Sequence, residues 1–179
     1  MQASTTHAMH LSTLLAGLIE SPLAHDPEIS GITLDSRAVQ QGWLFIAVPG
    51  ARTDGRAYIA GAYSRGAAAV VYEVNGFEPD ARSASAIGVR ELRQQIGAIA
   101  DRFYGAPSRK LKVVGITGTN GKTTTTHLLA QVLDRPDARC GLIGTLGSGF
   151  PGQLDPSLHT TPDAVSVHRL MAEFVAAGA

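Results

Sequence analysis

Two spacings of apolar residues alternate along the chain and predict an alternation of helices and strands. Apolar side chains three or four positions apart predict helices over residues 11–19, 56–65 and 89–103, then a helix ending near 133 and another through 167–175. Short apolar runs bounded by turn residues predict strands at 32–34, 43–48, 68–72, 111–117 and 140–143. This alternation is typical of α/β folds with a mostly parallel sheet.

A polar segment divides the alternation into two parts. Residues 75–86 are rich in Gly, Pro, Ser and Asp, a composition typical of linkers. We therefore expect a small N-terminal α/β domain over residues 1–87. Residues 88–179 are expected to begin a second α/β domain with a mostly parallel sheet.

Composition narrows the class of protein. The 179 residues are 44% hydrophobic and 17% charged, as in an ordinary soluble globular chain. Lys plus Arg and Asp plus Glu number 15 each, so no net positive charge attracts nucleic acid or anionic membranes, and we expect neither as a partner. Cys140 is the only cysteine, which excludes an internal disulfide and a thiolate metal cluster. The apolar stretch 11–19 is too short to span a bilayer and has no basic flank, so we expect a cytoplasmic protein.

The most specific chemical signal is a Gly-rich turn between an apolar strand and a helix. Residues 113–117 read Val-Val-Gly-Ile-Thr, and the turn that follows contains Gly118, Gly121 and Lys122. Glycines let backbone N–H groups converge on anionic oxygens, and the N-terminus of the next helix adds a positive end. The generic pattern G-x-x-x-x-G-K-[ST] is not matched in full, because a strand residue five positions before Gly121 replaces its first glycine. The strand before the turn and the amphipathic helix after it still favour a triphosphate-binding loop over a chance match.

Three separated stretches of this sequence resemble the Mur ligase family, and within it the MurE type. They are residues 33–37 with 42–47 and 50–56, the loop 118–124, and residues 159–163. Together these stretches span nearly the whole chain. The resemblance implies an N-terminal domain that binds the uridine diphosphate of the substrate, followed by the start of a P-loop domain that binds ATP.

The resemblance also implies roles for individual residues. The implied substrate contacts are Leu34 and Ser36 at the uridine, Ala51, Arg52 and Thr53 in a loop that closes over the nucleotide, and His159, Thr160 and Thr161 at the muramoyl peptide. The implied ATP contacts are Gly118, Thr119, Asn120, Gly121, Lys122, Thr123 and Thr124. Lys122 is the implied catalytic cation, and the Thr123 hydroxyl is the implied ligand of Mg²⁺. Residues 35–37 taken alone fit an ordinary polar turn, and Thr161 also fits the cap of a helix whose first residue is Pro162.

The activity implied is ATP-dependent amide formation in the synthesis of peptidoglycan precursors. The carboxylate of UDP-N-acetylmuramoyl-L-alanyl-D-glutamate would attack the γ-phosphate of ATP, and a diamino acid, meso-diaminopimelate or lysine, would then displace phosphate. The acidic Mg²⁺ ligand, the modified lysine and the amino-acid-binding domain of the family have no counterpart in these residues. We therefore expect an N-terminal fragment that is inactive alone.

Two alternatives stay open from the residues. One is the related ligase that adds D-alanyl-D-alanine, which residues 119–120 and 160–163 disfavour. The other, from a different class, is a non-catalytic module that binds a uridine-linked cell-wall precursor.

Overall fold

The computed structural model describes residues 8–19, 22–50, 53–80, 85–156 and 162–179. The chain divides into two compact units, Met1–Phe103 and Tyr104–Ala179. The boundary expected at residue 87 therefore lies inside the first unit. The reason is that the helix after the linker, α3 (Leu92–Phe103), packs against β5 (Ala69–Glu73) and α1 (Leu11–Leu14) of that unit.

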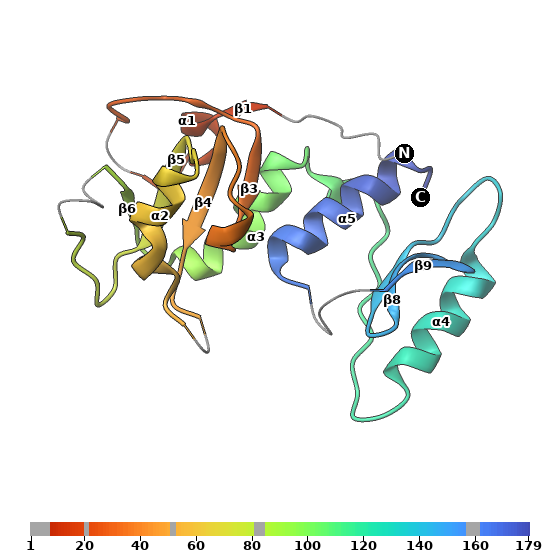
Figure 1. Ribbon diagram of the computed structural model, residues 1–179. Coiled ribbons are helices and arrows are strands. Elements are labelled where there is room, and N and C mark those ends of the chain that lie inside the picture. The colour runs from red at the N-terminus through yellow and green to blue at the C-terminus, as the bar shows by residue number, and fades with distance from the viewer. Residues whose placement is uncertain (1–7, 20–21, 51–52, 81–84, 157–161) are drawn as a thin grey trace. The chain divides into compact units, whose positions relative to one another are not determined.

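The first unit is built on a four-stranded parallel sheet, which confirms the α/β class. Its strands lie side by side in chain order: β3 (Gly31–Thr33), β4 (Trp43–Ala47), β5 and β6 (Ile87–Val89) (Figure 1). The register pairs Ile32 with Leu44, Phe45 with Val70, and Tyr72 with Gly88. All five residues of β5 are buried, as expected for a parallel strand covered on both faces. A separate antiparallel pair joins β1 (Met9–His10) to β2 (Glu28–Ile29).

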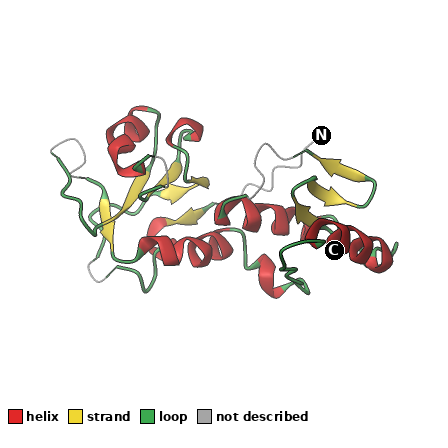
Figure 2. Ribbon diagram, turned by 90° about the horizontal axis from the view of Figure 1, so that it is seen from below, coloured by secondary structure: helices red, strands yellow, loops and turns green. Residues whose placement is uncertain are grey.

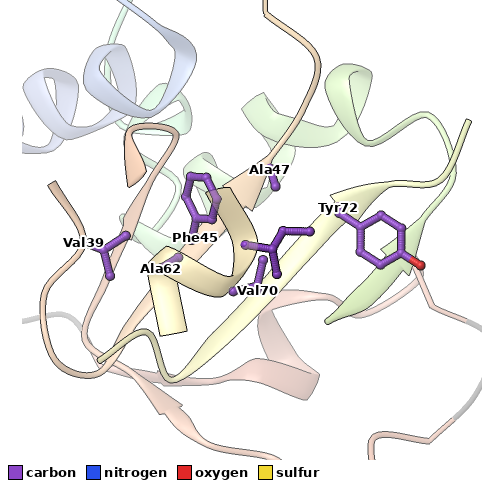
Figure 3. Close-up of a cluster of buried hydrophobic side chains, with 7 residues drawn as sticks. Val39, Phe45, Ala47, Ala62, Val70 and Tyr72 are labelled. Atoms are coloured by element: carbon purple, nitrogen blue, oxygen red, sulfur yellow. The ribbon is translucent and has the colours of Figure 1, made fainter. Parts of the chain in front are cut away.

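Helices cover both faces of this sheet (Figures 1 and 2). The helix α2 (Ile59–Ser64) lies on one face, with α3 and α1 on the other. Figure 3 shows the hydrophobic cluster that α2 forms with the sheet. It consists of Val39, Phe45, Ala47, Ile59, Ala62, Val70 and Tyr72. Phe45 and Val70 are fully buried there, and burial of side chains of this size stabilises the fold by about 1.5–3 kcal/mol each.

Three predicted elements of the first unit are shorter than expected. The helix expected over 11–19 ends at Leu14, and Gly17 has a φ of 79° that interrupts helical geometry. The segment expected as one helix over 56–65 is a 3-10 turn, η2 (Gly55–Tyr58), followed by α2. Val89 ends β6 instead of opening a helix, and Glu91, with φ of 52°, precedes the first residue of α3.

The second unit contains helices and an antiparallel sheet. After η3 (Pro107–Arg109) come α4 (Lys122–Leu133), the strands β7 (Leu142–Gly144), β8 (Gly147–Phe150) and β9 (Gln153–Asp155), and α5 (Ala164–Ala176). The sheet order is β7-β8-β9, with both pairs antiparallel. The parallel sheet predicted for this unit is therefore absent from the residues that the structure describes.

The strand predicted over 111–117 is likewise wrong for the described chain. This segment pairs with no described strand, and Val113 and Val114 are 65% and 62% exposed. A strand needs a partner for its backbone groups, and the other strand predicted for this unit, which forms β7, pairs with β8. A cavity of about 710 Å³ lies between this segment, α4, residues 138–143 and α5.

The two long helices of this unit differ in how they pack. On α4 only Ala130 is buried, and the apolar side chains of Leu128, Val132 and Leu133 are exposed. On α5 the apolar stripe predicted over 167–175 is confirmed in part, because Met171 and Phe174 are buried while Val167, Leu170 and Val175 are half-buried. Over the residues described, neither these helices nor any other has the length and apolar character needed to cross a bilayer.

Candidate functional site

In the first unit, the predicted substrate residues lie at the carboxyl edge of the parallel sheet. Leu34 and Ser36 directly follow β3, and Thr53 lies in the loop after β4. Because parallel strands end at one edge, the sheet brings these two segments to the same side. Ala51, Arg52, His159, Thr160 and Thr161 lie outside the described residues.

The turn after β3 is held by the carboxylate of Asp35. It caps η1 (Ser36–Ala38) by accepting a hydrogen bond from the backbone N–H of Arg37 at 2.9 Å. The Arg37 guanidinium donates to the same carboxylate through Nε at 3.0 Å and Nη2 at 2.7 Å. This hydrogen bond raises the pKa of Arg37, although its side chain is 84% exposed. Ser36 is thus presented, half-buried, by a capped polar turn.

The loop after β4 folds back on itself. The N–H of Gly50 donates to the carbonyl of Thr53 at 2.9 Å, and the N–H of Gly55 donates to the carbonyl of Val48 at 3.1 Å. A Cβ on Gly50 would lie 2.7 Å from the Thr53 carbonyl oxygen, and one on Gly55 would lie 2.8 Å from that of Val48. Both positions therefore require glycine, and the exposed side chain of Thr53 lies at the end of this closed loop.

An ion pair between a buried arginine and an exposed aspartate lies at the base of this loop. Arg56 donates through Nε to Oδ1 of Asp54 at 3.0 Å and through Nη2 to Oδ2 at 2.8 Å. The hydrogen bond with Arg56 lowers the pKa of Asp54, and the same bond raises the pKa of Arg56. Sequence reasoning did not single out Arg56. The available signal was the Asp-x-Arg spacing shared by residues 35–37 and 54–56.

In the second unit, the Gly-rich loop leads into a helix as predicted. Gly121, with φ of 77°, precedes the first residue of α4, and Gly118 has φ of 152°. Both conformations favour glycine, because a Cβ would strain them. No side chain caps the N-terminus of α4. The first backbone N–H groups of the helix and its positive dipole end are therefore available to an anion.

Lys122, the first residue of α4, folds back over its own loop. Its Nζ donates to the carbonyl of Gly118 and, at 3.4 Å, to that of Thr119. These carbonyls hold the ammonium group above the turn, where it is exposed. An anion in the turn would meet both the ammonium and the free N–H groups.

Thr123 contacts a residue that sequence reasoning missed. Its Oγ1 lies 3.1 Å from Oγ1 of Thr145, in the turn between β7 and β8. Nothing in the local sequence relates these positions, because 22 residues separate them. The donor set suits Mg²⁺ bound partly through phosphate oxygens, since this ion commonly takes few protein ligands.

The histidines and the cysteine of the described residues show no metal-binding or nucleophilic arrangement. Among the described residues, no group of three or more His, Cys, Asp or Glu side chains could hold a metal ion. His127 on α4 has a buried Nε2 atom, which has no hydrogen-bond partner among the residues that the structure describes. Burial raises the pKa of the Cys140 thiol, which makes it a poor nucleophile.

The cap predicted for the last helix is wrong in detail. Asp163, not Thr161, is the N-cap of α5, and the helix begins at Ala164. Ser166 donates to the Asp163 carboxylate through its backbone N–H at 2.9 Å and through Oγ at 3.0 Å. A carboxylate at this position also interacts favourably with the helix dipole, which explains why Asp163 caps the helix.

Comparison with known proteins identifies two family models in this chain. The Mur ligase family catalytic domain matches residues 28–104, and the Mur ligase middle domain matches residues 116–179. The first model covers the parallel sheet and the second covers the Gly-rich loop from Ile116 onward.

Several curated relatives from different bacteria share one name. The UDP-N-acetylmuramoyl-L-alanyl-D-glutamate--2,6-diaminopimelate ligase of Ectopseudomonas mendocina (strain ymp) is 54% identical over 152 residues, which cover 84% of this chain and 31% of the relative. The ligase of the same name from Alkalilimnicola ehrlichii is 46% identical over 180 residues, covering 96% of this chain and 36% of the relative. The chain thus spans about a third of the length of the curated relatives it matches.

Solved structures agree in fold. A structure of UDP-N-acetylmuramoyl-L-alanyl-D-glutamate--2,6-diaminopimelate ligase matches 96% of this chain with a TM-score of 0.74 at 30% identity, over 34% of that protein. A MurF structure from Acinetobacter baumannii matches 94% of this chain and 33% of its own, with a TM-score of 0.59 at 22% identity, which shows likeness of fold alone.

Proposed function

The chain belongs to the Mur ligase family, and we propose that it supplies the substrate-binding and ATP-binding parts of a diaminopimelate-adding ligase. The reaction would join 2,6-diaminopimelate to UDP-N-acetylmuramoyl-L-alanyl-D-glutamate in the cytoplasm. The observation that carries this proposal is the 54% identity to a ligase of that name over 152 residues, a length that must include parts of both units.

The first unit is proposed to bind the UDP-linked substrate. Ligands of open parallel sheets bind outside the carboxyl ends of the strands, where Leu34, Ser36 and Thr53 lie. The Ser36 and Thr53 hydroxyls can donate to carbonyl or diphosphate oxygens and accept from N–H groups. Ala51 and Arg52 of this unit are proposed to add contacts to the nucleotide, and His159, Thr160 and Thr161 of the second unit are proposed to bind the muramoyl peptide.

The second unit is proposed to bind ATP at its Gly-rich loop. The N–H groups at the start of α4 would bind phosphate oxygens, and Lys122 would move from its loop carbonyls to the γ-phosphate. Attack by the substrate carboxylate needs no general base, because a carboxylate is already ionised near neutral pH. The task of these residues is to orient the phosphates and neutralise the charge that develops on them. Thr119, Asn120 and Thr124 complete the proposed ATP site.

Mg²⁺ is proposed as the metal partner of ATP. When bound, the ion would neutralise charge on the phosphate oxygens. Thr123 is the proposed protein ligand, because its hydroxyl lies in the first turn of α4 directly after Lys122.

Calorimetric titration with UDP-N-acetylmuramoyl-L-alanyl-D-glutamate tests the proposal, with UDP-N-acetylglucosamine as the comparator that lacks the peptide. The proposal predicts binding of both, with the peptide-bearing ligand bound more tightly. Absence of binding by both ligands would contradict it.

A further inference from the structure

Arg56 is a charged residue buried inside the first unit. Its side chain is 8% exposed, whereas that of its partner Asp54 is 42% exposed. Burying a guanidinium is costly unless its donors are satisfied. Here Nε and Nη2 are bonded to the Asp54 carboxylate, and Nη1 donates to the carbonyls of Glu73 at 3.1 Å and Asn75 at 2.7 Å. The guanidinium carbon also lies 4.9 Å from the centroid of the Phe77 ring.

These contacts join two loops at the carboxyl edge of the sheet. Asp54 belongs to the closed loop after β4, and it caps η2 by accepting from the Arg56 backbone N–H at 3.0 Å. Glu73 is the last residue of β5, and Asn75 lies in the loop that follows. Arg56 therefore fixes the base of the first loop, next to Thr53, against the end of the neighbouring strand.

The chain contains a second pair with the same local geometry and a different environment. Arg37 makes the same two-pronged contact with Asp35, but its side chain is 84% exposed and makes no contact with carbonyls of another strand in the described residues. The local Asp-x-Arg turn thus forms without burial. Burial of Arg56 is not needed to form that turn, and what it adds is the link to Glu73 and Asn75.

We propose that Arg56 is a positioning residue, which holds Thr53 and the backbone hydrogen bonds of Gly50 and Gly55 in the arrangement that binds the UDP-linked substrate. This inference rests on the proposed function of the first unit. Arginine suits the task, because its planar fork reaches a carboxylate and two carbonyls at once. A lysine would keep the charge and lose that fork.

Three variants of the 179-residue chain separate positioning from general stability. Arg56→Ala removes all the side-chain contacts and leaves the backbone N–H bond to Asp54, and Arg56→Lys keeps the charge without the fork. Arg65→Ala is the control, because Arg65 is an exposed arginine of the same unit that donates to Gly61 within its own helix. Each variant is first checked for folding by circular dichroism and thermal melting.

Two readouts follow, hydrogen exchange and calorimetry. Hydrogen exchange at the Gly50 and Gly55 amides reports loop closure, with β4 and β5 amides as the internal reference. Titration with UDP-N-acetylmuramoyl-L-alanyl-D-glutamate reports binding, with ATP as the ligand of the other unit. In folded Arg56→Ala and Arg56→Lys we expect faster exchange at both glycines, about ten- to hundredfold weaker binding of the UDP ligand, and unchanged ATP affinity. Arg65→Ala should match the parent.

The outcomes distinguish this inference from the proposed function. Unchanged exchange at both glycines, or UDP-ligand affinity equal to that of the parent in both Arg56 variants, would overturn the positioning role. A merely structural role would lower the melting temperature and leave affinity intact below it. If the parent chain itself does not bind the UDP ligand, the proposed function fails and the substrate part of this inference fails with it.

Discussion

Asp134 and Arg139 join the end of α4 to the segment that enters β7. Oδ1 of Asp134 accepts from Arg139 Nε at 2.9 Å and from the backbone N–H of Cys140 at 2.9 Å. These hydrogen bonds, first that from Cys140 and then that from Arg139, lower the pKa of Asp134 below its ordinary value of 3.8. The residue that follows the helix therefore fixes, through one carboxylate oxygen, the start of the next segment.

The lowered pKa predicts how stability depends on pH. Because the folded state favours the charged form, the contribution of Asp134 is fully present above pH 3.8 and is lost as the pH falls through the lowered folded-state pKa. Asp134→Asn should be less stable than the parent at pH 7, and the gap should narrow as the pH falls below 3.8. Urea unfolding across this range measures the gap. Asp137→Asn is the control, because that side chain is 80% exposed, and a gap for Asp134→Asn that stays constant with pH would contradict the prediction.

A close contact in the second unit predicts the effect of a single methyl group. A Cβ on Gly141 would lie 2.5 Å from Cδ2 of Phe174, which is buried and packs beside Phe150 at 5.3 Å between ring centroids. Gly141→Ala should destabilise this unit by about 1–3 kcal/mol through overpacking. Gly144→Ala is the matched control, because no atom lies within 4 Å of a Cβ there. Equal unfolding midpoints for the two variants in urea would show that the contact is not as tight as described.

The first unit was predictable from sequence because local pattern and tertiary environment agree there. The runs at 43–48 and 68–72 are apolar throughout, as buried parallel strands require, and they form β4 and β5. The exposed Val113 and Val114 show the opposite case. Their strand-like pattern needs a neighbouring strand, which no local signal supplies and which the described residues do not contain.

The candidate site was predictable from sequence only where local backbone geometry determines the residue type. Gly118, Gly121 and Lys122 were identifiable, because the backbone of a phosphate-binding turn demands these residue types locally. The burial of Arg56 and the contact of Thr145 were missed, because Glu73 lies 17 residues from Arg56 and Thr123 lies 22 residues from Thr145, and these residues become neighbours only after folding. The helix cap shifted to Asp163, because Asp and Thr are both good caps and the sequence does not decide between them.

Lys122 should dominate ATP affinity. Lys122→Ala deletes a charge-assisted contact to the phosphates, so ATP binding to the 179-residue chain should weaken about ten- to hundredfold. Lys110→Ala is the control, since Lys110 is an exposed lysine after η3, outside the Gly-rich loop. Calorimetric titration with ATP and Mg²⁺ measures both, and an affinity within about twofold of the parent for Lys122→Ala would remove Lys122 from the phosphate site.

Ser36 should contribute to binding of the UDP-linked substrate. Loss of one neutral hydrogen bond costs about 0.5–1.5 kcal/mol, so Ser36→Ala should weaken this ligand about two- to tenfold. The control is Ser64→Ala, because the Ser64 hydroxyl donates to the Ala60 carbonyl within α2, away from the carboxyl edge. If the two variants bind the UDP ligand equally well, Ser36 makes no useful contact with it.

The central claim is that the two units bind different nucleotides at separate sites. A two-ligand titration tests it most directly: UDP-N-acetylmuramoyl-L-alanyl-D-glutamate is added to the 179-residue chain with and without saturating ATP and Mg²⁺, and to Lys122→Ala. The account predicts one equivalent of the UDP ligand in every case, with no displacement by ATP and no loss in Lys122→Ala. Competition between ATP and the UDP ligand, or loss of UDP-ligand binding in Lys122→Ala, would contradict it.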